Sequence, residues 1–247
     1  MVTKQFCNGN LELPSIGFGC GIGGYSTSEI NYRKLKPLIK KSIDLGSNLI
    51  DTSPIYGNGE SEIVIGEIIN GIRENVILAT KVLPENTSYD GVISSIDSSL
   101  MRLKTDYIDL FQVHWPNPDI PLDDTFRAME KLVSDGKVKY IGVSNFTVKE
   151  ITEVLKILKS NELASVQTEY NLFERSIEEE LLPLSEKYDF AILAYSPLAQ
   201  GRLANGKVQI KIIEDLARKY DANPAQIILQ YLIKNQNTIP IPNTSKV

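Results

Sequence analysis

Eight short apolar stretches, rich in β-branched residues, recur along the chain between longer segments of mixed polarity. In chain order they read SIGFG, NLID, VILATKV, YIDLFQVH, YIGVSN, SVQTEY, FAILAYS and TIPIP. They lack the strict alternation of apolar and polar residues that marks a sheet with one solvated face. The pattern therefore predicts strands of a parallel sheet that is covered on both faces.

The segments between these stretches have the spacing of amphipathic helices. Two of them place apolar residues on one helical face: Val92, Ile93, Ile96, Leu100 and Leu103 in the first, Ile151, Val154, Leu155 and Leu158 in the second. Glycines suited to left-handed C-caps follow three such segments, and a proline suited to a first helical turn begins another: Gly46, Gly71, Gly136 and Pro37. The chain therefore repeats a strand followed by a helix.

Strands that recur in this way, eight times without a linker, favour a closed barrel over an open sheet. We expect an α/β fold, a (β/α)₈ TIM barrel, as a single domain over residues 1–247. Before the first strand, the segment KQFCNGNLELP predicts a β-hairpin that turns at Asn8-Gly9-Asn10 and plugs the bottom of the barrel.

At the other end, TIPIP is followed only by NTSKV, so the final barrel helix and the C-terminal loop are expected to be missing. An uncovered eighth strand exposes apolar backbone. We therefore expect either a partner surface, such as another copy in an oligomer, to fill the gap, or a longer parent protein.

Composition narrows the class of protein. The hydrophobic share of 42% allows a sizeable core, and the net charge of −5 is spread along the chain, so no nucleic-acid partner is expected. Two cysteines, Cys7 and Cys20, form neither a disulfide framework nor a metal-ligand set. No apolar run approaches the ~20 residues of a membrane span, and the start lacks a secretory signal. We expect a cytoplasmic protein without a metal site.

Polar residues stand at or near the carboxyl ends of six predicted strands, the ends at which barrel enzymes place their active sites. They are Asp51, Lys81, His114, Ser144, Asn145, Gln167, Glu169 and Tyr195, and His114 is the only histidine of the chain. Each alone has an ordinary structural explanation, such as a solvated lysine or a hydrogen-bonded core histidine. Together they indicate a site.

The chemistry that fits these groups is carbonyl reduction. Asp51 and Lys81 can satisfy each other's charge. Tyr56 follows Asp51 by one short loop, so its phenol can reach the mouth of the barrel, the face formed by the carboxyl ends of the strands. A phenol has a pKa near 10, which a neighbouring ammonium lowers, so Tyr56 becomes a usable proton donor. A neutral His114 could donate a hydrogen bond to the substrate carbonyl. Packing of the tyrosine against the core is the alternative.

Reduction needs a nicotinamide or a flavin, because no side chain carries hydride. Ser144, Asn145 and Gln167 could form hydrogen bonds with the carboxamide of a nicotinamide, and Tyr195 could stack on the nicotinamide ring. These residues could equally form hydrogen bonds with one another. The segment GCGIGG, residues 19–24, matches the dinucleotide fingerprint of a Rossmann fold, but no helix pattern begins at its third glycine.

The chain resembles the aldo-keto reductases over nearly its full length. The resemblance is carried by LPSIGFGCG, NLIDTSPIYGNGESEIVIGE, VILATKV, LKTDYIDLFQVHWP, GKVKYIGVSNF, QTEYNLF and AYSPLAQGRL. It implies a (β/α)₈ fold and reversible reduction of aldehydes or ketones with NADPH/NADP, NADH being possible. A catalytically weak regulatory subunit that keeps the coenzyme pocket is the alternative.

The resemblance also implies roles for single residues. Tyr56 is the proton donor, Lys81 modifies its pKa, Asp51 pairs with Lys81, and His114 orients the carbonyl. The expected coenzyme contacts are Cys20, Gly21, Asp51, Ser144, Asn145, Gln167 and Tyr195, with Ser196, Leu198 and Gly201 along the pyrophosphate and Lys246 at the 2′-phosphate. From their apolar character we further expect Trp115, Pro116 and Tyr25 to line the substrate pocket and to favour a hydrophobic or aromatic carbonyl. Packing of Trp115 in the interior is the alternative.

Overall fold

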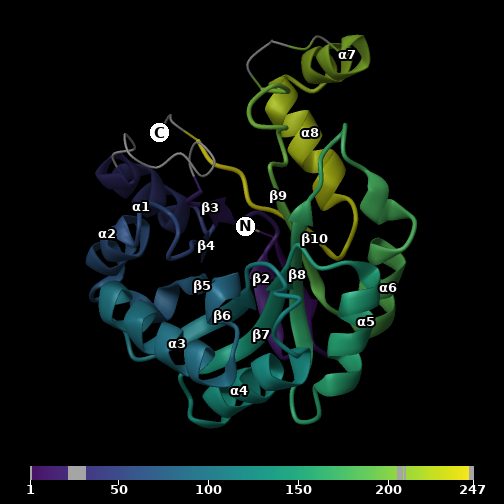
Figure 1. The fold of residues 1–247 in the computed structure, drawn as a ribbon. Helices are drawn as coiled ribbons and strands as arrows, with labels where there is room; N and C mark the ends of the chain where they lie inside the picture. Colours follow the sequence, from purple (N-terminus) through teal and green to yellow (C-terminus); the bar gives the residue numbers. More distant parts are fainter. Residues whose placement is uncertain (1, 22–31, 205–207, 209, 245–247) are drawn as a thin grey trace.

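The predicted parallel sheet is present in the computed structural model, which describes residues 2–21, 32–204, 208 and 210–244. Each strand pairs in parallel with the next one along the chain, so the sheet order follows the sequence (Figure 1). The strands are β3 Phe18–Gly19, β4 Leu49–Asp51, β5 Ile77–Val82, β6 Ile108–Val113, β7 Val138–Ser144, β8 Leu163–Glu169, β9 Ala191–Tyr195 and β10 Thr238–Pro240. The predicted (β/α)₈ architecture is confirmed.

Hydrogen bonds join the two ends of this sheet. The Gly17 amide donates to the Pro240 carbonyl and the Gly19 amide to the Pro242 carbonyl, each over 3.0 Å. A Cβ on Gly19 would lie only 2.7 Å from the carbonyl oxygen of Ile241, so only glycine permits this approach. The sheet thus curls until its first strand meets the segment that follows its last.

An antiparallel hairpin, β1 Thr3–Phe6 and β2 Leu11–Pro14, precedes the sheet, as predicted. Its turn contains Asn8 and Gly9, both with positive φ. The hairpin buries apolar side chains in one cluster with inward-facing strand residues: Phe6, Leu11, Leu13, Leu49, Ala79, Leu110, Ala191, Leu193 and Ile239. The hairpin therefore plugs the bottom of the barrel.

A second apolar cluster lies between the strands and the surrounding helices. The longer helices are α1 Lys36–Asp44, α2 Glu60–Ile69, α3 Tyr89–Leu103, α4 Leu122–Ser134, α5 Val148–Ile157, α6 Leu181–Tyr188, α7 Lys211–Lys219 and α8 Pro224–Ile233. The short 3₁₀ turns are η1 Tyr32–Leu35, η2 Arg73–Asn75, η3 Pro84–Asn86 and η4 Ser176–Glu178. Within the described ranges no helix is long and apolar enough to cross a membrane.

Local chemistry sets where the helices begin and end. α5 begins at Val148, ahead of the apolar residues of its buried face, because Thr147 and Glu150 form a capping box. Pro37 lies in the first turn of α1, as expected. The glycines expected after helices, Gly46, Gly71 and Gly136, all have positive φ.

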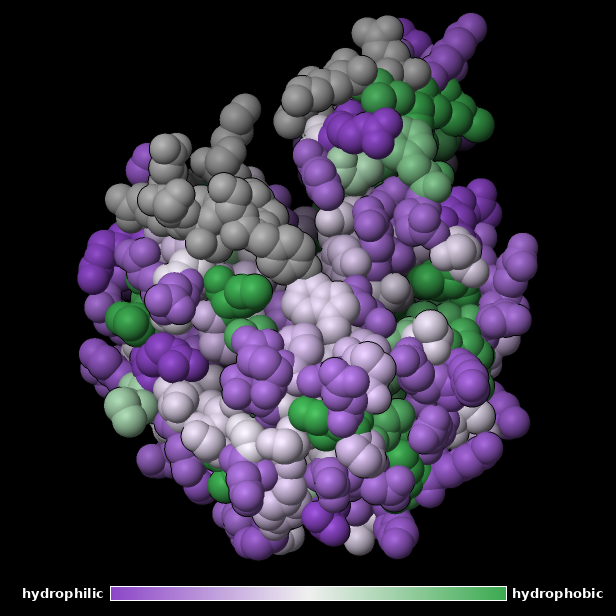
Figure 2. Space-filling model, in the orientation of Figure 1, coloured by the Kyte–Doolittle hydropathy of each residue, from purple (hydrophilic) through white to green (hydrophobic). Residues whose placement is uncertain are grey.

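Two helices, α7 and α8, lie between β9 and β10. Figure 1 shows α8 rising away from the barrel with α7 at its far end, and Figure 2 shows hydrophobic side chains gathered there. Ile212 and Tyr220 are more than half exposed on this projection. The described chain ends at Thr244, shortly after β10, so the expectations of a missing final helix and of a covering partner stay predictions.

Candidate active site

Asp51 and Lys81 form a buried ion pair at the mouth of the barrel. The ammonium of Lys81 donates to both carboxylate oxygens of Asp51, over 2.9 and 2.8 Å, and to the Thr52 carbonyl over 2.8 Å. Lys81 is 0% exposed and Asp51 2%. An ammonium has three N–H groups, so these partners can satisfy it fully. The pairing arises because β4 and β5 are parallel neighbours and bring their carboxyl ends together.

Two amides complete the shell around Asp51. The Nε2 groups of Gln167 and Gln112 donate to its Oδ1 over 2.8 and 3.2 Å. Gln112 was not predicted as a site residue. A signal for it existed, since it stands two residues before His114, and residues two apart on a strand share a face.

A second layer of polar groups holds these strand ends from the helix side. Glu62, 0% exposed at the start of α2, accepts hydrogen bonds of 2.6 Å from the Thr80 hydroxyl and from Arg102 Nε. Thr80 is the direct neighbour of Lys81. This layer fixes the backbone that carries the ammonium.

Tyr56 reaches the same mouth from the loop after β4. Its amide donates to the Ser53 carbonyl over 3.0 Å, and its ring centroid lies 5.3 Å from Lys81 Nζ. A Cβ built on Gly21 would lie 3.1 Å from Cζ and 3.2 Å from Oη of Tyr56. The absence of a side chain at Gly21 therefore lets the phenol occupy this position.

His114 lies directly after β6, only 4% exposed. Its Nδ1 is 3.0 Å from the Ser53 hydroxyl, Trp115 stacks on its ring at 3.8 Å, and the Tyr56 ring meets it edge-on at 6.1 Å. Burial, and secondarily the charge of Lys81, lower the pKa of His114 to about 2. The imidazole is therefore neutral at physiological pH, so one ring nitrogen can donate a hydrogen bond and the other can accept one.

The expected carboxamide contacts are hydrogen-bonded to one another. Asn145 Nδ2 donates to the His114 carbonyl over 3.0 Å and to Ser144 Oγ over 3.1 Å, and Tyr195 Oη donates to Asn145 Oδ1 over 3.0 Å. Gln167 is bonded to Asp51. The structure thus shows the alternative of mutual bonding and at the same time gathers these residues beside the ion pair.

The remaining expected coenzyme residues lie in two places. Cys20 is fully buried, and its amide donates to the Asp51 carbonyl. Burial, followed by the charge of Asp51, raises the pKa of its thiol.

Ser196, Leu198 and Gly201 form tight turns directly after β9, and Asn171 Nδ2 donates to the Ser196 carbonyl. Lys246 and Tyr25 lie outside the described residues.

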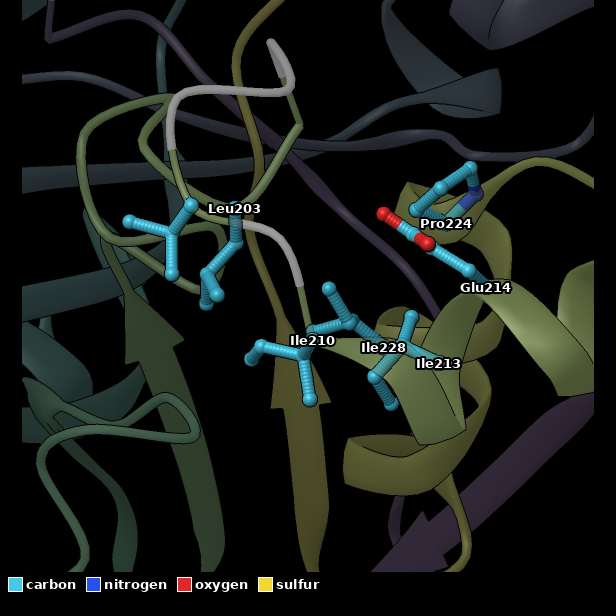
Figure 3. A pocket seen from close by; sticks show the side chains of 7 residues that line it. Leu203, Ile210, Ile213, Glu214, Pro224 and Ile228 are labelled. Carbon is cyan, nitrogen blue, oxygen red and sulfur yellow. The ribbon is translucent and has the colours of Figure 1, made fainter.

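A separate small hollow lies under the projecting helices. In Figure 3 its side chains converge from the loop after β9 and from α7 and α8, with Glu214 as the one charged group among Leu203, Val208, Ile210, Ile213, Pro224 and Ile228. It continues the apolar contact between that loop and α8. Apart from Glu214 its lining is apolar, without the lysine, histidine and amide groups that are gathered at the mouth.

Comparison with known proteins gives a consistent answer. Residues 15–247 match the model of the Aldo/keto reductase family. Methylglyoxal reductase YeaE of Escherichia coli is 36% identical over 242 residues, which cover 97% of this chain and 84% of that protein. Glyoxal reductase of Bacillus subtilis is 34% identical, with 99% and 83% covered. An aldo-keto reductase from Klebsiella pneumoniae in complex with NADPH superposes with a TM-score of 0.87, at 34% identity, over 100% of this chain and 86% of that one.

Proposed function

Since the chain belongs to the aldo/keto reductase family, we propose that it is an NADP(H)-dependent oxidoreductase that reduces small aldehydes and ketones to alcohols. The observation that carries this proposal is the convergence of Asp51, Lys81, Tyr56 and His114 at one mouth, although they come from three separate strand ends and a loop. These groups can deliver a proton to a carbonyl oxygen and hold the carbonyl in place.

The residues at the mouth suit a nicotinamide coenzyme. Ser144, Asn145 and Gln167 supply hydroxyl and amide groups that match a carboxamide, and the partly buried Tyr195 offers an aromatic face. The tight turns from Ser196 to Gly201 bring backbone to the same mouth, where a pyrophosphate could run. When bound, the reduced coenzyme supplies the hydride for the carbonyl carbon. The NADPH complex of the Klebsiella pneumoniae relative supports the same choice.

Tyr56 is the proposed proton donor. As the proton leaves for the carbonyl oxygen, negative charge develops on the phenol oxygen, and the Lys81 ammonium stabilises it. Asp51 pairs with that ammonium and holds it in place inside the barrel. His114, neutral and held between Tyr56 and Trp115, donates a hydrogen bond that orients the carbonyl.

For the substrate we propose small 2-oxoaldehydes as the first class to test. Two relatives are named for methylglyoxal and glyoxal, which are compact dicarbonyls. The Trp115 ring is stacked on His114 and so places a flat apolar surface against the imidazole that is proposed to orient the carbonyl.

The test is loss of NADPH absorbance when purified protein is mixed with methylglyoxal, glyoxal or an aromatic aldehyde, repeated with NADH. We expect turnover with NADPH and at least one aldehyde. Coenzyme binding without turnover of any carbonyl would instead favour the regulatory-subunit alternative and contradict the proposal.

A further inference from the structure

The loop residue Ser53 controls one side of the His114 ring. Ser53 is fully buried, two residues after Asp51. Its Oγ lies 3.0 Å from His114 Nδ1 and 3.4 Å from the backbone nitrogen of Ile55.

The direction of the Ser53–His114 bond follows from its second partner. The Ile55 amide can only donate, so it uses a lone pair of the Ser53 oxygen. The hydroxyl proton then has one acceptor within the described parts of the chain, the lone pair of Nδ1. If Nδ1 carried the proton instead, the buried Ser53 O–H would lose that acceptor, an expensive arrangement.

We propose that Ser53 is a positioning residue that fixes His114 in the tautomer protonated on Nε2, so that the ring presents an N–H donor rather than a lone pair to the substrate carbonyl. This inference rests on the proposed function, because the value of the donor lies in orienting a carbonyl. Ser53 acts through His114 and needs no contact with substrate itself.

Two further observations make the tautomer matter. The ring is neutral, since its pKa is lowered to about 2 by burial and by Lys81, so only one ring nitrogen carries a proton. The ring is also held by Trp115 on its face and Tyr56 at its edge. Rotation of the ring to exchange the two nitrogens would break the Ser53 bond and these contacts.

The chain offers a direct test because His114 is its only histidine. Protein labelled with ¹⁵N and free of a histidine tag gives one imidazole in a two-bond ¹H–¹⁵N correlation spectrum. We expect a protonated Nε2 and an unprotonated, hydrogen-bonded Nδ1 at neutral pH. A protonated Nδ1 in the wild-type protein would overturn the inference without any variant being made.

The Ser53→Ala variant should move the Nδ1 resonance toward that of an unbonded nitrogen or draw both resonances together by exchange. Turnover should fall by about fivefold, the factor that corresponds to one typical net hydrogen bond, while the KM for NADPH stays unchanged. Ser53→Thr should restore both. Unchanged ¹⁵N resonances in Ser53→Ala would contradict the assignment.

Ser185→Ala is the matched control, since it removes another fully buried serine hydroxyl, which donates to the Leu182 carbonyl far from the mouth. It should leave the imidazole spectrum as in the wild type. The spectrum and the assay also separate two failures. A protonated Nε2 in a protein that reduces no carbonyl refutes the proposed function alone, whereas a protonated Nδ1 in an active reductase refutes the role of Ser53 alone.

Discussion

The interior of the barrel has two ends that the same strands build in opposite ways. Below, Leu49, Ala79 and Leu110 pack against the hairpin in a dry apolar layer. Two residues further along those strands stand Asp51, Lys81 and Gln112, joined by hydrogen bonds. Side chains two residues apart on a strand share a face, so the apolar layer and the charged layer lie next to each other on the inner face of the same strands.

The two ends of the barrel interior therefore contribute differently to stability and to chemistry. The lower layer stabilises the fold by removing apolar surface from water. The upper layer carries buried charge, which is tolerated because Lys81 and Asp51 pair and every N–H of the ammonium has an acceptor. We therefore expect changes below to alter stability alone, and changes above to alter chemistry and, where they leave a buried charge unpaired, stability as well.

The largest effect is expected from Lys81→Met, which leaves the buried Asp51 carboxylate without its cation. The free energy of unfolding should fall by about 3–5 kcal/mol, and turnover by about 100-fold or more, as measured by urea unfolding and NADPH oxidation. Adding Asp51→Asn should recover part of the stability and none of the turnover. The control Lys131→Met removes an exposed cation paired with Asp135 on α4 and should change stability by less than ~1 kcal/mol.

The hairpin provides the opposite case. Leu13 is 0% exposed, and Leu13→Ala should lower the free energy of unfolding by about 2–5 kcal/mol. Turnover per folded molecule should stay at the wild-type value, because the mouth is untouched. Glu12→Ala, on the exposed side of the same strand, should be within ~0.5 kcal/mol of the wild type. A fall in turnover per folded molecule in Leu13→Ala would show that the two ends of the barrel interior are coupled.

A smaller effect is expected from pH. The pKa of His114 is lowered to about 2 in the folded protein, whereas an unfolded histidine titrates near 6.5. Between these two pH values the unfolded chain binds more protons than the folded chain. The contribution of His114 to the free energy of unfolding is therefore fully present above about pH 6.5, and it falls as pH decreases, by up to ~1.4 kcal/mol per pH unit. Urea unfolding between about pH 6.5 and 5 should show this slope in the wild type. The slope should be absent in His114→Asn, and an equal slope in both proteins would contradict it.

Much of this arrangement could be predicted from the sequence, since it depends on periodicity and on strand ends. The eight strands and the approach of Asp51 to Lys81 follow from where polar residues interrupt apolar runs. The start of α5 at Val148 does not follow from apolar spacing, because a capping box formed by Thr147 and Glu150 sets it.

The hydrogen bonds inside the site were harder to predict. Gln112 and Gln167 both donate to Asp51, and Asn145 bonds the His114 carbonyl from a left-handed conformation. These bonds depend on side-chain rotamers and on φ angles at single residues, which neither composition nor periodicity determines. Ser53 was missed for the same reason, since a serine after a strand end most often forms a local turn.

Tyr56→Phe is the sharpest test of whether the mouth of the barrel is a carbonyl reduction centre with Tyr56 as its proton donor. This change removes one oxygen and leaves the ring beside His114 and Lys81 in place. NADPH-dependent reduction of methylglyoxal should fall by about 100-fold or more, while NADPH binding, followed by fluorescence, should be retained. Turnover at the wild-type rate in Tyr56→Phe would contradict this role of Tyr56.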